Sequence, residues 1–185
     1  TADAALSAEH ALLNLDPDVN YAEWMRNIRK AMGDNGSVPG IVPTGGWGTL
    51  WGNGPAWDNV LLYLPYFVYL YRGDKTILEE SAASILRYLH YLTTRVNEEG
   101  LIKIGLGDWC PPNGNAAIDC PIPVSSTAFH YHDADLVSQA AAVLGKTEDA
   151  AHYAALRDRI GKAFVDKFYD KTNKTFGSQT ANAMA

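Results

Sequence analysis

The sequence predicts an all-α fold made of three antiparallel helical hairpins. Apolar residues recur every three or four positions in six segments, the period of a helix that buries one face. Short glycine breaks follow the third and fifth segments, and such breaks return the next helix beside the one before it. Long irregular segments follow the second and fourth, so these longer connections should gather at one end of the molecule.

The first two helices lie before residue 33. The first ends before Asp16 and Pro17, and four of its residues share one face: Leu6, His10, Leu13 and Asn14. The second ends at Gly33, and its apolar positions are Val19, Tyr21, Trp24, Met25, Ile28 and Met32. Residues 37–54 are rich in proline and glycine around Trp47 and Trp51, so we predict a long loop there.

The third and fourth helices form the second hairpin. Pro55 suits the first turn of a long, largely apolar helix, in which Pro65 should produce a kink. Gly73 breaks the chain after it. The fourth helix ends before Gly100 and has an apolar stripe formed by Ile77, Ala82, Ile85, Leu86, Leu89 and Leu92.

The last hairpin follows a second long irregular segment, residues 97–124. Loops of this length in compact domains are usually functional, so we expect ligand chemistry on the two long loops. The fifth helix is expected over about residues 125–144 and the sixth over about 147–169, with Thr147 as its cap. Residues 178–185 suggest a cap and the start of another helix. Because the sequence also lacks an initiating Met, we expect it to be a piece of a longer domain.

Composition excludes several classes of function. The chain has 185 residues, of which 47% are hydrophobic, enough for one buried core. A net charge of −6 argues against binding to nucleic acid or anionic lipid. No apolar stretch is long enough for a membrane span, and no charged-then-apolar leader opens the sequence. Nothing indicates a cellular compartment, and a Cys110–Cys120 disulfide and two free thiols are both open alternatives.

The sequence predicts no metal or cofactor site. His130 and His132 are two residues apart, so on a helix they point to different sides and cannot easily share an ion. Hydrogen-bonded imidazoles near the start of a helix are the favoured interpretation. The glycines near residues 45–54 follow no predicted strand and lack the lysine of a phosphate-binding loop. Cys110 and Ser125 lack a local turn that would expose them as nucleophiles.

Aromatic residues on glycine-rich loops indicate a carbohydrate ligand. Stacking on a ring covers the apolar face of a sugar while polar groups bind its hydroxyls. Cleavage of a glycosidic bond requires two carboxyl groups, and the candidates are Asp3, Asp58, Asp108 and Asp119. Asp58, beside Trp57, could instead be a first-turn acid stabilised by the helix dipole. Asp108, beside Trp109, could instead shape its loop through an Asx turn.

Three sequence runs resemble the bacterial α-L-rhamnosidases of glycoside hydrolase family 78. They are V-P-G-I-V-P at 38–43, P-A-W-D-N-V at 55–60 and G-D-W-C-P-P at 107–112, in the family's order. The opening Thr1-Ala2-Asp3 is similar to the end of the family's W-T-G-D run, with Ala2 in place of the glycine. The similarity covers nearly the whole chain.

This resemblance implies an (α/α)6 toroid, of which three hairpins are about half, and residues 1–185 would be one catalytic domain truncated at both ends. It implies inverting hydrolysis of terminal α-L-rhamnosides and a rhamnose-containing glycoside or polysaccharide as ligand. By matching motif, Asp3 would bind sugar hydroxyls, and Trp57 and Trp109 would form walls around the rhamnose. Asp58 and Asp108 are their neighbours and are also candidate substrate-binding residues.

The resemblance places no catalytic residue in the chain. The family's general acid belongs to a D-C-P-x-R-D-E motif that would precede Thr1, and its general base belongs to the missing half of the ring. Asp119-Cys120-Pro121 shares only three letters with that motif. We therefore expect the segment to be inactive alone, and its uncovered apolar faces could make it dimerise.

Two alternatives are open. Another (α/α)-toroid glycosidase with a different sugar would also carry aromatic loops. A non-enzymatic hairpin scaffold would use exposed aromatic anchors for protein partners, with the candidates Trp24, Tyr66, Tyr69 and Tyr88.

Overall fold

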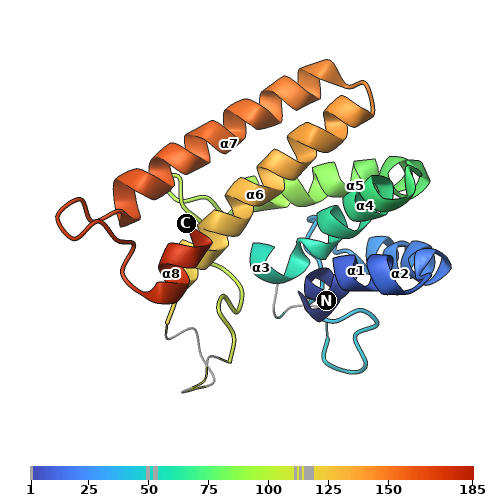
Figure 1. Ribbon diagram of the computed structural model, residues 1–185, viewed down its shortest axis with the longest axis horizontal. Helices are drawn as coiled ribbons and strands as arrows, with labels where there is room; N and C mark the ends of the chain where they lie inside the picture. Colours follow the sequence, from blue (N-terminus) through green and yellow to red (C-terminus); the bar gives the residue numbers. More distant parts are fainter. Residues whose placement is uncertain (1, 49–50, 52–53, 111, 113, 115–118) are drawn as a thin grey trace.

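The computed structural model describes residues 2–48, 51, 54–110, 112, 114 and 119–185, and all regular elements in these ranges are helices (Figure 1). Thr1 and Pro111, which belong to the motifs above, lie outside the described residues. The helices in chain order are α1 (Ala2–Asn14), α2 (Asp18–Ala31), α3 (Pro55–Asp58), α4 (Val60–Arg72), α5 (Thr76–Thr93), α6 (Ile122–Val143), α7 (Thr147–Phe168) and α8 (Gln179–Met184).

The helices are arranged as a partial ring of hairpins. Helices α6 and α7 run side by side as one hairpin, and α4 packs on α5 as a second (Figure 1). The first helices of successive pairs contact one another, α1 on α4 and α4 on α6, while α2 packs on both α4 and α5. The structure thus confirms the predicted fold class of helical hairpins that form part of a toroid.

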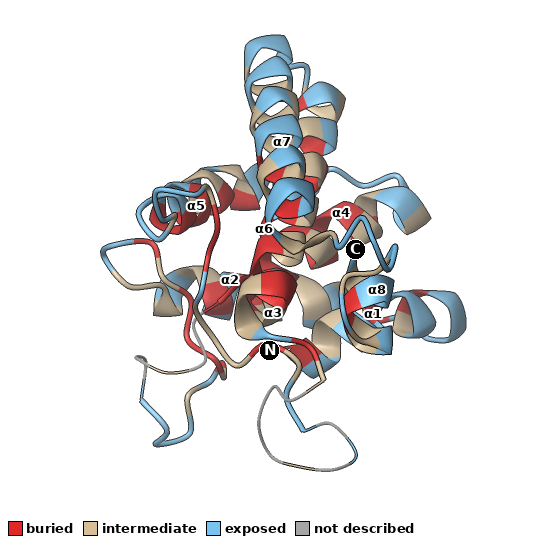
Figure 2. Cartoon of the chain, turned by 90° about the vertical axis from the view of Figure 1, so that its left-hand side faces the viewer, coloured by how far each residue is buried: buried red, intermediate tan, exposed pale blue. Residues whose placement is uncertain are grey.

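The predicted third helix is divided in two. Helix α3 is a single turn, and Asn59 separates it from α4. The buried hydrophobic residues concentrate in the middle of the molecule, on α4, α5 and α6 (Figure 2). Helix α4 continues through Pro65 and ends at Gly73, which has a φ of +71° and donates its N–H to the Tyr69 carbonyl at 2.8 Å.

Two local predictions were wrong, and a third was confirmed. Leu6 and Leu13 of α1 are 84% and 68% exposed, and Ala8 and Leu12 are buried instead. Small side chains let α1 approach α4 closely. This packing, and not hydrophobicity alone, determines which face of α1 is buried. Thr147 is the first residue of α7 and not its cap, because Lys146 occupies the cap position. The predicted cap Ser178 is confirmed, since its hydroxyl oxygen accepts the Ala181 N–H at 3.0 Å.

The two long connections lie at one end of the molecule, as predicted. Figures 1 and 2 show the segment between α2 and α3 and the segment between α5 and α6 extending from the same end of the helices. The second connection is attached to α6 by buried hydroxyls. Thr127 Oγ1 accepts the Ile102 N–H at 3.1 Å, and Ser126 Oγ donates to the Ile104 carbonyl at 2.8 Å.

Most of the residues proposed as anchors of a protein-binding scaffold belong to the core. Tyr88 is fully buried, Tyr66 is nearly so, and Tyr66 also donates a hydrogen bond to Gln139. Trp24 and Tyr69 are half-buried against the same core. Within the described residues, none of the helices combines the length and apolar character needed to cross a membrane.

Candidate functional site

A cavity of about 560 Å³ opens at the end of the molecule that carries the long connections. The start of α1, helix α3, the first turns of α4, residues 107–110, and single residues of α6 and α8 line it. This volume is in the usual range for small-ligand sites. Four of the five predicted site residues line the cavity together: Asp3, Trp57, Asp108 and Trp109.

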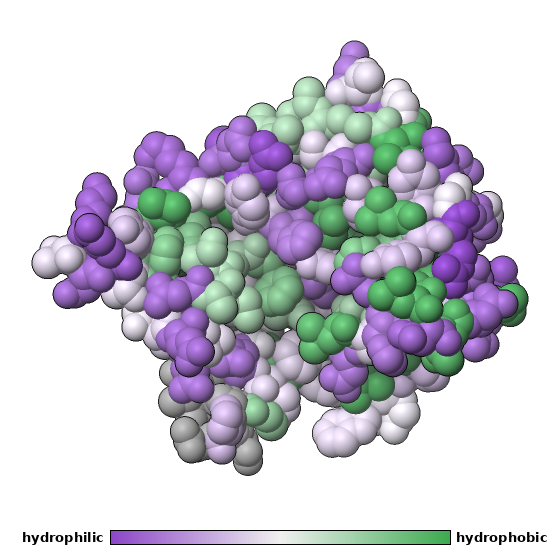
Figure 3. All heavy atoms as spheres, in the orientation of Figure 1, coloured by the Kyte–Doolittle hydropathy of each residue, from purple (hydrophilic) through white to green (hydrophobic). Residues whose placement is uncertain are grey.

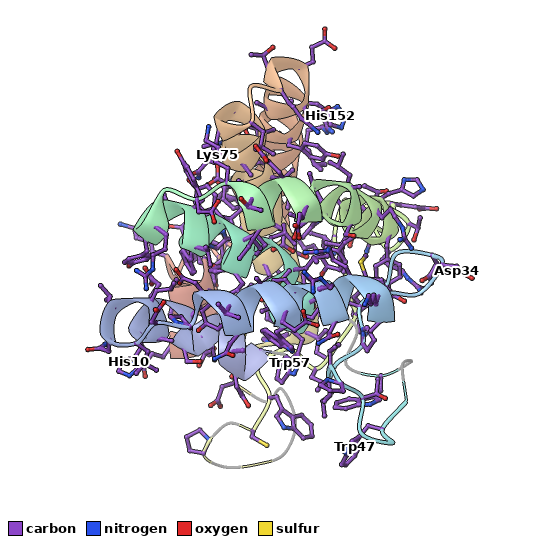
Figure 4. The ribbon with its side chains drawn as sticks, turned by 90° about the vertical axis from the view of Figure 1, so that its right-hand side faces the viewer. His10, Asp34, Trp47, Trp57, Lys75 and His152 are labelled. Atoms are coloured by element: carbon purple, nitrogen blue, oxygen red, sulfur yellow. The ribbon has the colours of Figure 1, made fainter. Side chains whose placement is uncertain are left out.

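Trp57 is placed by the single turn of α3. The Gly54 carbonyl accepts the N–H groups of both Trp57 and Asp58 at 2.9 Å, and Pro55 supplies the helical φ of the first turn. Figure 4 shows Trp57 at the end of the helices from which the loops extend. Gly54 itself lies against the second connection, because a Cβ added to it would be 2.8 Å from the Gly105 Cα. Helix α3 therefore rests directly on the backbone that carries Trp109.

Asp108 and Trp109 are placed by an irregular backbone. Gly107 and Cys110 have φ values of +62° and +56°, and the Trp109 N–H donates to the Gly107 carbonyl at 3.0 Å. In this tight turn both side chains line the cavity, and the Trp109 side chain stays 46% exposed. Burial, followed by the charge of Asp108, raises the pKa of the Cys120 thiol.

Asp58 does not join the other four residues, which corrects the expectation from sequence. Neighbouring residues on a helix point about 100° apart, so the turn that directs Trp57 to the cavity directs Asp58 into the core. The side chain is fully buried, and neither carboxyl oxygen has a hydrogen-bond partner among the described residues. Burial first and the Asp133 carboxyl second raise the pKa of Asp58 well above its ordinary value.

Glu9 is a cavity residue that the sequence analysis missed. It lies on α1 with Asp3 and Leu6, and all three line the cavity. Tyr71 Oη donates to Glu9 Oε1 at 2.7 Å, which fixes one carboxylate oxygen. The spacing of three residues from Asp3 to Leu6 and from Leu6 to Glu9 was the available signal, since it places them along one side of a helix.

An aromatic and amide stripe on α4 was also missed. Asn59, Tyr63 and Phe67 are four residues apart and all line the cavity. The Tyr63 and Phe67 rings meet edge to face with centroids 5.1 Å apart. Burial, followed by the charges of Asp133 and Glu9, raises the pKa of Tyr63, so its phenol stays neutral and can both donate and accept.

The first long connection contributes no described residue to this cavity, contrary to the expectation that both loops carry ligand chemistry. Its Trp47 is exposed, and the Trp47 and Trp51 rings pack on each other with centroids 5.6 Å apart. Of the described parts of the two connections, the second alone lines the cavity, and its contacts with Gly54 and α6 hold it beside the site.

The two histidines face different sides of α6, as predicted. His132 packs on the Tyr63 ring with centroids 4.9 Å apart. His130 is fully buried, and neither of its ring nitrogens has a described hydrogen-bond partner, so the expected hydrogen-bonded imidazole is wrong for this residue. Burial lowers the pKa of His130 to about 4, which leaves the ring neutral at physiological pH.

Neither a disulfide nor a metal cluster is part of the described site. Cys110 is an exposed free thiol and Cys120 a buried one. The described residues contain no group of three or more His, Cys, Asp or Glu side chains placed to hold an ion.

The chemistry of the cavity suits a ligand with both polar and apolar parts. Two indoles and the Phe67 and Phe129 rings offer apolar surface, while Asp3 and Asp108 offer hydrogen-bond acceptors. A sugar ring with hydroxyls on its edge and C–H groups on its face matches this combination.

The whole chain matches a known family. Residues 1–185 match the family model described as the bacterial alpha-L-rhamnosidase 6-hairpin glycosidase domain. An α-L-rhamnosidase of Formosa agariphila is 31% identical over 194 residues, covering 100% of this chain and 20% of the relative. An α-L-rhamnosidase of Streptomyces avermitilis is 31% identical, covering 96% of this chain and 16% of the relative.

Solved structures of similar proteins have the same fold as this chain. The α-L-rhamnosidase from Dictyoglumus thermophilum superposes with a TM-score of 0.90 at 32% identity, over 99% of this chain and 21% of that one. The Streptomyces avermitilis α-L-rhamnosidase complexed with L-rhamnose gives a TM-score of 0.87 at 28% identity, over 100% of this chain and 17% of that one. The chain thus spans about a fifth of the length of these relatives.

Proposed function

Because this chain belongs to the family of bacterial α-L-rhamnosidase six-hairpin glycosidase domains, we propose that it forms part of the catalytic domain of an enzyme that hydrolyses terminal α-L-rhamnosides. The observation that carries the proposal is the meeting of Trp57, Trp109, Asp3 and Asp108 at one cavity. Asp3 and Trp57 are separated from Asp108 and Trp109 by about fifty residues or more of sequence, and the fold brings them together.

Each group has a distinct part in holding the sugar. The indoles of Trp57 and Trp109 cover the ring faces, and the carboxylates of Asp3 and Asp108 accept hydrogen bonds from its hydroxyls. A 6-deoxy sugar also has a methyl group, which needs apolar surface such as that of Phe129. Glu9 adds a carboxylate whose orientation is fixed by Tyr71, and it suits a further hydroxyl.

We assign these residues to binding and place the bond-breaking carboxyls in other parts of the protein. Inverting hydrolysis needs a protonated acid at the leaving oxygen and a carboxylate that activates water on the opposite face. The D-C-P-x-R-D-E motif that would supply the acid does not occur in these 185 residues. The segment alone is therefore inactive, and hydrolysis by the full-length protein proceeds with inversion at the anomeric carbon.

The proposal is tested with the full-length product of the gene that contains this segment. It should hydrolyse an aryl α-L-rhamnoside and release β-L-rhamnose first, as followed by proton NMR. Trp57→Ala and Trp109→Ala should each lower kcat/KM at least about tenfold, whereas the control Trp47→Ala, outside the cavity, should not. A preference for a different glycoside would favour another toroid glycosidase, and turnover by residues 1–185 alone would refute the assignment of the catalytic carboxyls.

The isolated segment should self-associate through the α6–α7 hairpin. Tyr131 and Val165 are 40% and 46% exposed, and they border apolar hollows that Ala128, Phe164 and Met184 also line. Figure 3 shows apolar surface gathered across this part of the molecule. Such a patch favours association when nothing covers it. Sedimentation of residues 1–185 should show dimers or larger species, and Val165→Glu should shift the distribution toward monomer.

A further inference from the structure

Helices α3, α5 and α6 meet at a group of buried polar side chains that the proposed binding role does not use. Asp58 of α3, Tyr88 of α5 and Asp133 of α6 are each fully buried. Within the described residues, neither the four carboxyl oxygens nor the Tyr88 hydroxyl has a hydrogen-bond partner. The three helices pack together through α6, which contacts both α3 and α5.

The two aspartates of this group lack a salt-bridge partner among the described residues, since none of the ion pairs there includes Asp58 or Asp133. His130, one turn before Asp133 on α6, is neutral because burial lowers its pKa to about 4. Tyr63, on α4, is a neutral phenol whose pKa is raised by burial and then by Asp133. The Gly54 backbone and the positive charge of the N-terminus lower the pKa of Asp58, but burial and Asp133 outweigh them. Two ionised carboxylates in such surroundings would therefore carry a large desolvation cost.

The electrostatic effects within the group agree with a neutral state. Burial raises the pKa of Asp133, and burial followed by Asp133 raises that of Asp58. Burial, followed by the charges of Asp58 and Asp133, raises the pKa of Tyr88. Two carboxylates cannot hydrogen-bond to each other, but a carboxylic acid can donate to a carboxylate or to a second acid.

We propose that Asp58 and Asp133 form a proton-sharing carboxyl pair, with Tyr88 beside it, that fixes α3 on α6 and so positions Trp57 in the cavity. The pair retains at least one proton, which lies between an oxygen of Asp58 and an oxygen of Asp133, and no bond is made or broken elsewhere. Asp58 is thus a positioning residue that acts through its neighbour Trp57. That last step rests on the proposed sugar-binding role of Trp57.

A single helical turn needs such an attachment. Helix α3 has four residues, too few to be stable by itself, and Asn59 separates it from α4. On one side it is held by the contact of Gly54 with the second connection, and on the other by its packing on α6, where Asp58 is the buried polar group. Loss of the carboxyl pair would leave the direction of the Trp57 indole determined by Gly54 alone.

The first test measures how the stability of the full-length protein depends on pH. A carboxyl whose pKa is raised by folding stabilises the protein below its unfolded pKa, near 4, and this contribution is lost as pH rises toward the folded pKa. An amide cannot ionise, and replacing both acids removes both buried carboxyls. The Tm of the double variant Asp58→Asn/Asp133→Asn minus that of wild type should therefore increase from pH 4 to pH 8. The exposed control Asp34→Asn should show no such trend, and a flat or falling difference for the double variant overturns the proposal.

A measurement on the wild-type protein keeps the test valid if these variants fail to fold. With aspartate carboxyls labelled with carbon-13, the infrared spectrum at pH 7 should contain the shifted carbonyl band of a protonated aspartic acid. Absence of that band overturns the proposal.

The second test concerns Trp57 and uses the folded full-length enzyme well below its melting temperature. Asp58→Ala should raise KM for an aryl α-L-rhamnoside about tenfold or more, because the indole is misplaced. Asp58→Asn keeps a hydrogen-bonding group of the same shape and should stay within about threefold of wild type. Equal losses in both variants overturn the positioning role. If the pH and infrared results hold but the protein cleaves no rhamnoside, the carboxyl pair stands and the proposed function fails.

Discussion

The two Trp–Asp neighbours of this protein, Trp57-Asp58 and Asp108-Trp109, have the same side chains and opposite arrangements. In the first, Trp57 lines the cavity and Asp58 is fully buried. In the second, both side chains line the cavity. A short motif therefore identifies candidate residues, but the local backbone conformation determines which of their side chains reach the cavity.

The backbone supplies the physical reason. On a helix, adjacent side chains diverge by about 100°. The single turn of α3 can therefore direct only one of Trp57 and Asp58 to the cavity, and the other points into the core. In the tight turn between Gly107 and Cys110, two residues with positive φ redirect the chain and leave both side chains on the open side. The segments that carry the two Trp–Asp neighbours contact each other where Gly54 lies against Gly105.

Protonation of the buried His130 should produce the largest effect, because it makes the unfolding free energy depend on pH. His130 is neutral when folded, with its pKa lowered from 6.5 to about 4, so the stability of the native state is full above pH 6.5 and is lost as pH falls through 4. His130→Leu removes this loss. The unfolding free energy of the variant minus that of wild type should rise by about 3 kcal/mol between pH 7 and pH 4, measured by urea denaturation. A difference independent of pH would mean that His130 is not buried as a neutral ring.

The next largest effect on stability is expected from the contact between Gly54, before α3, and Gly105 of the second connection. In Gly54→Ala the new Cβ would lie 2.8 Å from the Gly105 Cα and 2.9 Å from the Ile104 carbonyl oxygen, and backbone atoms cannot easily yield. We expect a loss of about 2 kcal/mol in unfolding free energy, together with weaker rhamnoside binding, since α3 must shift.

Gly45→Ala is the matched control for this change. Gly45 has a φ of +57° and no atom within 4 Å of an added Cβ, so the cost should be about 1 kcal/mol of backbone strain with no change in KM. Equal effects of the two substitutions on KM would show that the Gly54 contact does not shape the site.

The two tryptophans should differ in how much they contribute to folding. Both Trp57→Ala and Trp109→Ala should lower kcat/KM for an α-L-rhamnoside. Only Trp57, which is half-buried on helix α3, should also matter for folding. We expect a loss of about 1 to 2 kcal/mol in unfolding free energy for Trp57→Ala, and about 0.5 kcal/mol or less for the 46% exposed Trp109. Similar melting curves for the two variants would remove this distinction between helix and loop.

The smallest expected effect is that of Asp108→Asn. The side chain is half-buried at the cavity and outside the core, so its unfolding free energy should change by about 0.5 kcal/mol or less. KM should rise a few-fold, because an amide accepts hydroxyl hydrogen bonds less strongly than a carboxylate. Asp3→Asn, also at the cavity, should behave alike in both measurements.

Much of this architecture could be predicted because it is local. The periodic apolar residues, Gly73 after α4 and the Ser178 cap place most of the helices, and the conformations of such breaks and caps depend on near neighbours. The motifs that contain Trp57 and Trp109 also indicated two walls of one pocket. The face of α1 was not predictable, since burial of Ala8 in place of Leu6 depends on how closely α4 approaches.

Local sequence patterns were sufficient to predict the helical hairpins, the family and the residue types that a sugar site needs. Packing between helices determined which acids line the cavity: it buried Asp58, brought Glu9 and Tyr63 to the cavity, and left the described residues of the first long connection outside its lining. These outcomes depend on contacts between residues tens of positions apart. Such contacts follow from the packing of whole helices, which the spacing of residues within any one helix does not contain.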